Sequence, residues 1–331
     1  MFEMHQSTKD LASLCSAICL VFLAYNAVQN LESSAREGVG TIAIGVIYVV
    51  AIFSTALAPK LATTLGRKLS MVFGSLCYVL FIASNLHPVW GVMIPAAVLL
   101  GFGAAILWPV MLSYIQSYAT SHSELTSKDP DDCLNLFSSV FWGSFQGSQL
   151  LGNLLTYLII HFGHEDGNKD KHGSKRSETV LITVFAICAL LGSALLFSSP
   201  DRYREYSKTS SGGSISFWQT MEVLRSLRNL LLVPLYFYNG LEQSFAWCDF
   251  TKSMIGPAYG GDLSKIGLIM MLYSGTNVLV GLIASRLPSR RMVTASAIVF
   301  AICLQGLGVI WFRFIVPEAG HQRAVPALAL I

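Results

Sequence analysis

Long, continuous apolar runs constrain this chain more than any other feature of its sequence. A helix needs roughly 20 mostly apolar residues to cross a bilayer core about 30 Å thick, and hydropathy marks nine such runs. They lie near Leu11–Val28, Thr41–Leu61, Leu69–Leu86, Trp90–Tyr114, Leu134–Phe162, Val180–Phe197, Leu230–Phe250, Ile266–Ala284 and Met292–Val316. A membrane β-barrel would instead alternate polar and apolar residues in segments of about ten. The sequence therefore predicts an all-α, multipass integral membrane protein.

Composition and motif content exclude several other classes of protein. Charged residues make up only 12% of the chain and the net charge is +3, which gives no basic surface for nucleic acid. Six of the seven cysteines fall inside the apolar runs, without the spacing of a disulfide framework or a metal site. The histidines, serines and acids form no known catalytic motif. We therefore expect no enzyme, no cofactor and no bound metal.

A polar phrase occurs twice in the chain, each time inside an apolar run. YNAVQN begins at Tyr25, and YNGLEQ begins at Tyr238. A basic segment follows the next apolar run in each case, and these segments give the gating-loop candidates Gly66, Arg67, Lys68, Arg286, Arg290 and Arg291. Repeated features in the same order predict two related helical bundles whose polar groups meet near the middle of the membrane. We expect a six-helix N-terminal bundle at 1–197, a cytoplasmic linker with an interfacial helix at 198–229, and an incomplete C-terminal bundle at 230–331.

Polar side chains inside the runs are the candidates for a cavity or for partner recognition. Glu242 lies near the centre of its run, where an ionisable group is costly and often functional. Packing as a protonated or hydrogen-bonded group is the alternative reading. Asp249 and Lys252 are spaced to pair on one helix face. The other candidates are Tyr25, Asn26, Gln29, Asn30, Gln146, Gln149, Asn153, Tyr238, Asn239 and Gln243. These polar groups could line a solute path or form hydrogen bonds between helices.

Several separated motifs together resemble one known family. They are YNAVQNLESS, the segment from Pro59 to LGRK, GFGAAILWPVMLSY, FWGSFQGSQLLGN and YNGLEQSFAWCDFTKS. This combination, between about Leu11 and Arg291, resembles the unc-ninety-three family of ion-channel regulatory proteins, a branch of the major facilitator superfamily. Two departures matter. Thr63 stands where general facilitator proteins hold an Asp, and the three last helices of a twelve-helix bundle are missing.

The resemblance implies a non-enzymatic accessory or regulatory subunit that acts on a potassium channel or escorts a receptor. Membrane lipid is then a further partner, and the location is the plasma membrane or the endosomal membrane. A secondary transporter of a small solute is the alternative, because the fold alone does not fix the function. A non-functional truncated isoform or a gene-model fragment is the third interpretation.

Overall fold

The computed structural model describes residues 6–35, 38–55, 58–163, 171–199, 225–255, 259 and 262–284. Within these ranges every regular element is a helix. The elements are α1 (Gln6–Ala35), α2 (Val39–Thr55), α3 (Ala58–Leu65), α4 (Arg67–Ser84), α5 (Trp90–Thr126), α6 (Pro130–Gly163), α7 (Lys171–Ser198), α10 (Leu227–Ser244), the π-helix η1 (Phe245–Ile255) and α12 (Leu263–Ala284). The expected ninth span, most of the linker, and Arg286, Arg290 and Arg291 lie outside the described residues. The predicted all-helical class is confirmed.

The first eight apolar runs coincide with helices, and two of the runs are not the single regular helix that was expected. The second run was expected to continue as one helix to Leu61, but α2 ends at Thr55 and the separate helix α3 begins at Ala58. Pro59 lies in the first turn of α3, where its missing N–H removes no helical hydrogen bond. Hydropathy does not register such a break because both helices are apolar. The seventh run was expected as one regular helix, and it changes to a π-helix at Phe245.

Five described helical segments are long and apolar enough to cross a membrane by themselves. They are Gln6–Glu32, Arg67–Ser84, Trp90–Thr126, Arg176–Ser198 and Leu263–Val280, and Val39–Thr55 is a shorter apolar helix. The helices α6 and α10 are not among these segments, and polar side chains interrupt the apolar sequence of both. These are the helices that carry many of the candidate polar residues. The described part of the chain therefore has the composition of a multipass membrane protein.

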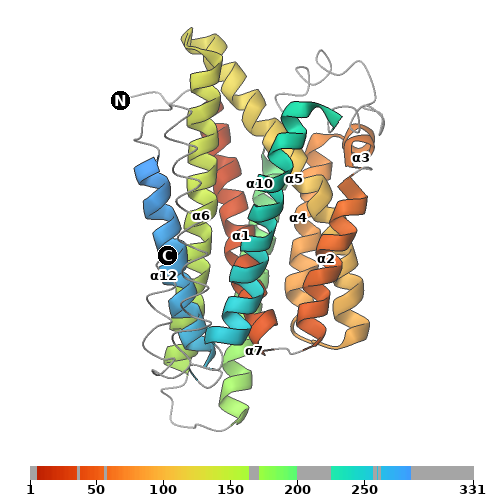
Figure 1. Ribbon diagram of the computed structural model, residues 1–331, viewed down its shortest axis with the longest axis vertical. Helices are drawn as coiled ribbons and strands as arrows, with labels where there is room; N and C mark the ends of the chain where they lie inside the picture. The colour runs from red at the N-terminus through yellow and green to blue at the C-terminus, as the bar shows by residue number, and fades with distance from the viewer. Residues whose placement is uncertain are drawn as a thin grey trace.

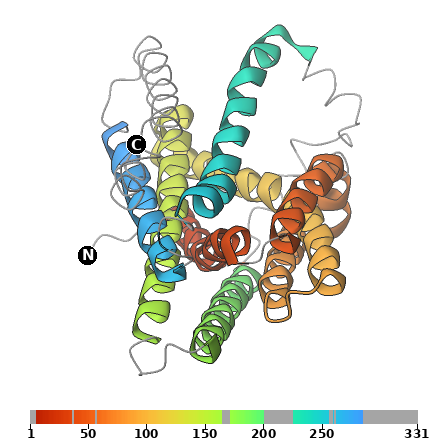
Figure 2. The ribbon, with the colours of Figure 1, turned by 60° about the horizontal axis from the view of Figure 1, so that its bottom comes forward.

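Helix α1 lies in the middle of the bundle (Figures 1 and 2). It packs against α6 and α7 and also contacts η1, α5, α4 and α12. Along this helix Ala17, Val21 and Ala24 are fully buried. Small residues let neighbouring helices approach closely in a membrane, where packing replaces the hydrophobic effect between helices. The polar phrase on α1 is therefore held in the interior of the bundle and not on its lipid-facing surface.

Glycines in α5 set the close approach of this helix to α2 and α4. A Cβ atom at Gly101 would lie 2.6 Å from the backbone oxygen of Ile47 in α2. A Cβ atom at Gly103 would lie 2.8 Å from Sγ of Cys77 in α4. Both positions therefore leave no room for a side chain in this packing. The contacts fix the position of the next two turns of α5, which carry Trp108 and Pro109.

Candidate functional site

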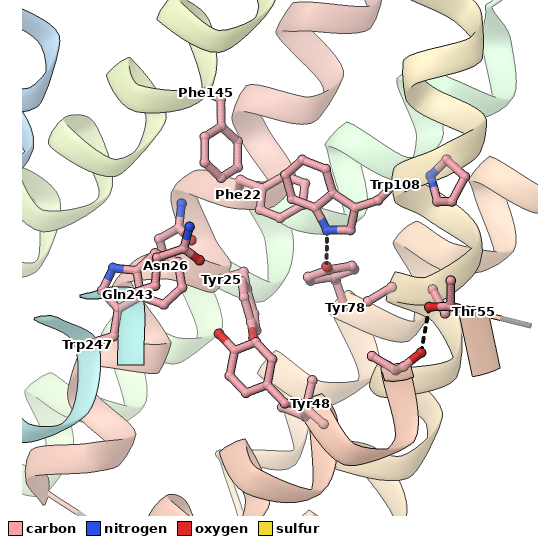
Figure 3. Close-up of a pocket in the computed structure, with 15 residues that line it drawn as sticks. Phe22, Tyr25, Asn26, Tyr48, Thr55, Tyr78, Trp108, Phe145, Gln243 and Trp247 are labelled. Carbon is pink, nitrogen blue, oxygen red and sulfur yellow. Dashed lines mark hydrogen bonds between the residues drawn. The ribbon is translucent and has the colours of Figure 1, made fainter. Parts of the chain in front are cut away.

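A cavity of about 310 Å³ lies where α1, α2, α4, α5 and α6 meet α10 and η1 (Figure 3). Both the N-terminal helices and the segment that carries the second polar phrase contribute to it. The lining residues are Phe22, Tyr25, Asn26, Ile47, Tyr48, Ala51, Thr55, Tyr78, Ala104, Ala105, Trp108, Pro109, Phe145, Gln243 and Trp247. This volume is at the lower end of the range of small-molecule sites. The cavity is the candidate functional site.

The first polar phrase places its four candidate residues in two directions. Tyr25 and Asn26 line the cavity, and Asn26 is 4% exposed. Gln29 donates from Nε2 to the hydroxyl oxygen of Tyr48 at 3.3 Å. Asn30 donates from Nδ2 to Oδ1 of Asn153 at 2.9 Å. The phrase therefore serves both the cavity and the contact between α1 and α6.

The second polar phrase reaches the cavity through its last residue. Gln243 lines the cavity, and Trp247 follows it one turn later in η1. Tyr238 is half-buried and Asn239 is exposed, and neither is among the described lining residues. Figure 3 shows Gln243 and Trp247 on the side of Asn26, opposite Trp108 and Tyr78. The two copies of the phrase thus meet at one cavity, but through non-equivalent residues.

Glu242 lies beside this cavity and faces α12. The hydroxyl group of Tyr273 donates a hydrogen bond to Oε1 of Glu242 at 2.6 Å. Glu242 is only partly buried. The side chain of Asp249 lies outside the described residues, and Lys252 is partly buried in η1. The structure therefore places Glu242 at a contact between two helices, and the expected Asp249–Lys252 pair stays a prediction.

Aromatic rings form most of the cavity wall and touch one another. The ring centroid of Phe22 lies 5.0 Å from that of Tyr78 and 5.1 Å from that of Trp108. Tyr25 and Tyr78 form an edge-to-face pair with centroids 4.8 Å apart. Nε1 of Trp108 donates to the hydroxyl oxygen of Tyr78 at 3.3 Å. Edge-to-face pairs of this kind hold the rings in fixed orientations.

Asn153 is the polar centre of the contact between α6 and its neighbours. Its Oδ1 accepts from Asn30, and its Nδ2 donates to the backbone oxygen of Gln149 at 2.9 Å. The same nitrogen lies 3.4 Å from Oγ of Ser274 in α12. Gln149 is buried, whereas Gln146 is partly buried and its Oε1 has no hydrogen-bond partner among the described residues. The three candidates on α6 therefore do not share one environment.

Arg67 joins the N-terminus of α4 to α5. Its guanidinium carbon lies 4.1 Å from the centroid of the Tyr114 ring, and its Nη2 donates to Oγ of Ser117 at 3.0 Å. Gly66 precedes it with a φ of 82°, a conformation that favours glycine. Lys68 lies over the ring of Phe197 at 5.4 Å. Both described basic residues of the gating loop thus contact aromatic rings.

Sequence reasoning missed several residues of this site. Tyr48, Tyr78 and Trp108 were not among the predicted candidates, because an aromatic residue in an apolar run carries no sign of the face it occupies. Glu32 was also missed, although it is fully buried and accepts from Nδ2 of Asn85 at 2.5 Å. The first span was expected to end at Val28, but α1 continues to Ala35. An acid inside a longer span would have been a candidate.

Solved structures of membrane transporters share this fold. The chain aligns over 97% of its length with 78% of a D-xylose-proton symporter, at a TM-score of 0.61 and 15% identity. It aligns over 97% of its length with 83% of the Escherichia coli xylose transporter XylE in a partially occluded inward-open conformation, at a TM-score of 0.55 and 14% identity. Likeness at such identity shows the fold alone. The described helices thus have the major facilitator-like fold of a multipass membrane protein.

The family model described as "Ion channel regulatory protein UNC-93" matches residues 13–318. The chain therefore belongs to the UNC-93 family, which confirms the resemblance seen in its motifs. UNC93-like protein 3 of Arabidopsis thaliana is 34% identical over 290 residues, which cover 85% of this chain and 61% of that protein. Protein unc-93 homolog A of Danio rerio is 29% identical over 316 residues, covering 86% and 67%. The putative potassium channel regulatory protein unc-93 of Caenorhabditis elegans is 24% identical over 303 residues, covering 82% and 43%.

The chain thus spans 61% of the length of the Arabidopsis relative and 67% of the zebrafish relative. The residues that the family model matches, 13–318, include most of α1 and all the later described helices. The channel-regulatory role in the printed names of the family and the C. elegans relative belongs to longer proteins, so it applies to this chain only as a proposal.

Proposed function

We propose that this membrane protein is a non-enzymatic regulatory subunit that acts on a potassium channel. The description of the family and the name of the C. elegans relative support this function class. Membrane lipid surrounds the described helices in this proposal, and the plasma membrane is the site of action. Escort of a receptor through endosomal membranes is the variant of the same non-enzymatic role.

The observation that carries the proposal is the environment of Arg67. In a transporter of this class, the two halves rock against each other around a central site, so contacts between the halves must change. Here Arg67 is held by Tyr114 and Ser117, and both belong to α5 of the same half. Neither partner is an acid, and Thr63 stands at the position where general facilitators hold an Asp. Contacts of Arg67 with uncharged partners in its own half need not break when the halves move. They suit a protein that keeps one conformation better than a transporter that alternates between two conformations.

Co-expression with a potassium channel tests this function. Proximity labelling with the tagged full chain first identifies channel subunits next to it in its own cells. The identified channel is then expressed with and without the chain, and current density and surface delivery are measured. We expect a change of at least twofold in one of them. Unchanged current and delivery for every labelled channel would contradict the proposal.

Secondary transport is the second candidate, and the cavity is the observation that favours it. Gln243 and Trp247 complete a cavity whose other walls come from the N-terminal helices. Alternating access needs a central site between two bundles of this kind. Purified protein in liposomes decides between the two candidates. Saturable, gradient-driven uptake by the chain alone would replace the regulatory role with transport.

A further inference from the structure

Several polar groups of the cavity can donate a hydrogen bond to a ligand. The hydroxyl oxygen of Tyr78 accepts from Trp108, and that of Tyr48 accepts from Gln29, each at 3.3 Å. A phenol that accepts through its oxygen keeps its own O–H for another acceptor. The amide nitrogen of Asn26 is buried and has no hydrogen-bond partner in the described part of the chain. A buried N–H without an acceptor costs about 1–3 kcal/mol, which a ligand that accepts from it would recover.

The rings of the cavity favour a flat ligand. Phe22, Tyr25, Tyr78, Trp108 and Phe145 contact one another with centroids between 4.8 and 6.2 Å apart. Tyr48 and Trp247 add two further rings to the wall, as Figure 3 shows. Aromatic ligands gain from offset stacking and edge-to-face contacts with such rings. A polyol would leave most of its hydroxyl groups unpaired against them, at a cost for each.

The wall carries no formal charge. Among the described lining residues there is no Asp, Glu, Lys, Arg or His. Two acids described close to the cavity are engaged elsewhere, because Glu242 accepts from Tyr273 and Glu32 accepts from Asn85. An ion buried at membrane depth without an opposite charge is strongly disfavoured. An organic cation would have ring faces but no carboxylate, and an anion would have donors but no positive charge.

From these features we propose that the cavity binds an uncharged aromatic or heteroaromatic molecule whose edge carries hydrogen-bond acceptors. The flat ring stacks against Trp108 and its neighbours, and the acceptors take the protons of Tyr48, Tyr78 and Asn26. The volume of about 310 Å³ admits one small bicyclic or monocyclic ligand. This ligand site is independent of channel regulation, since it requires only the cavity and not a partner protein.

Three ring compounds that differ mainly in charge give the test. Nicotinamide is neutral, nicotinate is an anion and 1-methylnicotinamide is a cation. Equilibrium binding of each radiolabelled compound is measured on the purified 331-residue chain in detergent, with caffeine as a second neutral ring and glucose as a polyol competitor. We expect saturable binding of a neutral ring, at least tenfold weaker binding of both charged analogues, and no competition by glucose.

Substitutions in the cavity wall test whether the ligand binds there. Ala51→Phe fills part of the space, and Asn26→Leu removes the unpartnered amide; each should weaken binding at least tenfold. Tyr157→Phe removes a hydroxyl group on α6 away from the described lining and should bind as the unaltered chain does. Melting temperature and elution volume show which variants are folded, and Tyr48→Phe replaces any variant that is not. Its single lost hydroxyl should weaken binding at least threefold.

Four results would overturn the proposal. If the folded protein binds neither nicotinamide nor caffeine, the cavity does not take neutral aromatic ligands. Tighter binding of the cation or the anion would assign the cavity to ions, and competition by glucose would assign it to polyols. Binding unaffected by both Ala51→Phe and Asn26→Leu would place the ligand elsewhere. Loss of channel regulation in cells would leave the binding result unchanged, so the two proposals fail separately.

Discussion

Asn30 and Asn153 are 123 residues apart in the chain and share a hydrogen bond of 2.9 Å in the interior of the bundle. The amide of Asn153 also lies 3.4 Å from the hydroxyl oxygen of Ser274. One side chain on α6 therefore contacts both α1 and α12. This relationship ties the first half of the chain to the segment that follows the linker.

Replacing Asn153 by Leu should destabilise the protein. The substitution removes the interhelical hydrogen bond and takes the Asn153 acceptor from Asn30 while keeping the side-chain volume similar. We expect a loss of about 1–3 kcal/mol in the free energy of unfolding, measured in mixed detergent micelles. Asn135→Leu on the exposed face of the same helix is the matched control. Equal effects of the two substitutions would show that the hydrogen bond contributes nothing specific.

Replacing Glu242 by Gln tests whether its charge matters. The amide keeps the size of the side chain and can still accept from Tyr273, but it cannot ionise. We expect normal expression and melting temperature together with loss of the effect on channel current or surface delivery. Tyr273→Phe, which removes the donor and keeps the carboxyl group, is the companion variant. An unchanged functional effect in Glu242→Gln would assign this residue to packing alone.

Arg67 should contribute to stability through both of its contacts. Arg67→Lys keeps a positive charge near Tyr114 but lacks the planar group that also reaches Ser117. We expect Arg67→Gln to cost about 1–2 kcal/mol and Arg67→Lys about half of that, measured by thermal unfolding in detergent. The exposed Lys128 provides the control substitution Lys128→Gln. A stability equal to that of the unaltered chain in Arg67→Gln would show that these contacts are not stabilising.

Two glycines in neighbouring helices should respond in opposite ways to a methyl group. Gly101→Ala would place Cβ 2.6 Å from a backbone oxygen of α2, so the helices must separate. We expect a loss of about 1–3 kcal/mol from this overpacking. Gly143→Ala on α6 meets nothing within 4 Å and should be neutral or stabilising by up to about 1 kcal/mol. Equal unfolding free energies for Gly101→Ala and Gly143→Ala would refute the close approach of α5 and α2.

Much of the fold follows from the sequence because a segment that crosses the bilayer core must be both apolar and helical. The run at Leu69–Leu86 and helix α4 differ by two residues at each end. The break between α2 and α3 was missed because a window average does not register Pro59. The π-helix was missed because helix type depends on tertiary packing and leaves no period in a short segment.

The candidate site was predictable only where polarity contrasts with its surroundings. Tyr25, Asn26 and Gln243 belong to the repeated phrase, and all three line the cavity. Tyr48 and Tyr78 lie in other apolar runs, and only the packing of α2 and α4 around α1 brings their hydroxyl groups to the same place. The functional roles assigned to these residues stay predictions.

The π-helix that begins at Phe245 has a consequence for the symmetry of the molecule. Its wider turn advances side chains around the axis more slowly than an α-helix does. Residues after Gln243 therefore face directions different from those of their counterparts after Asn30, although the two phrases match in sequence. Trp247 lies in this π-helix, so its place in the cavity wall depends on the wider turn. The first copy of the phrase lies in a regular α-helix at the centre of the bundle, whereas the second copy leads into a π-helix, so the two copies line one cavity from different kinds of backbone.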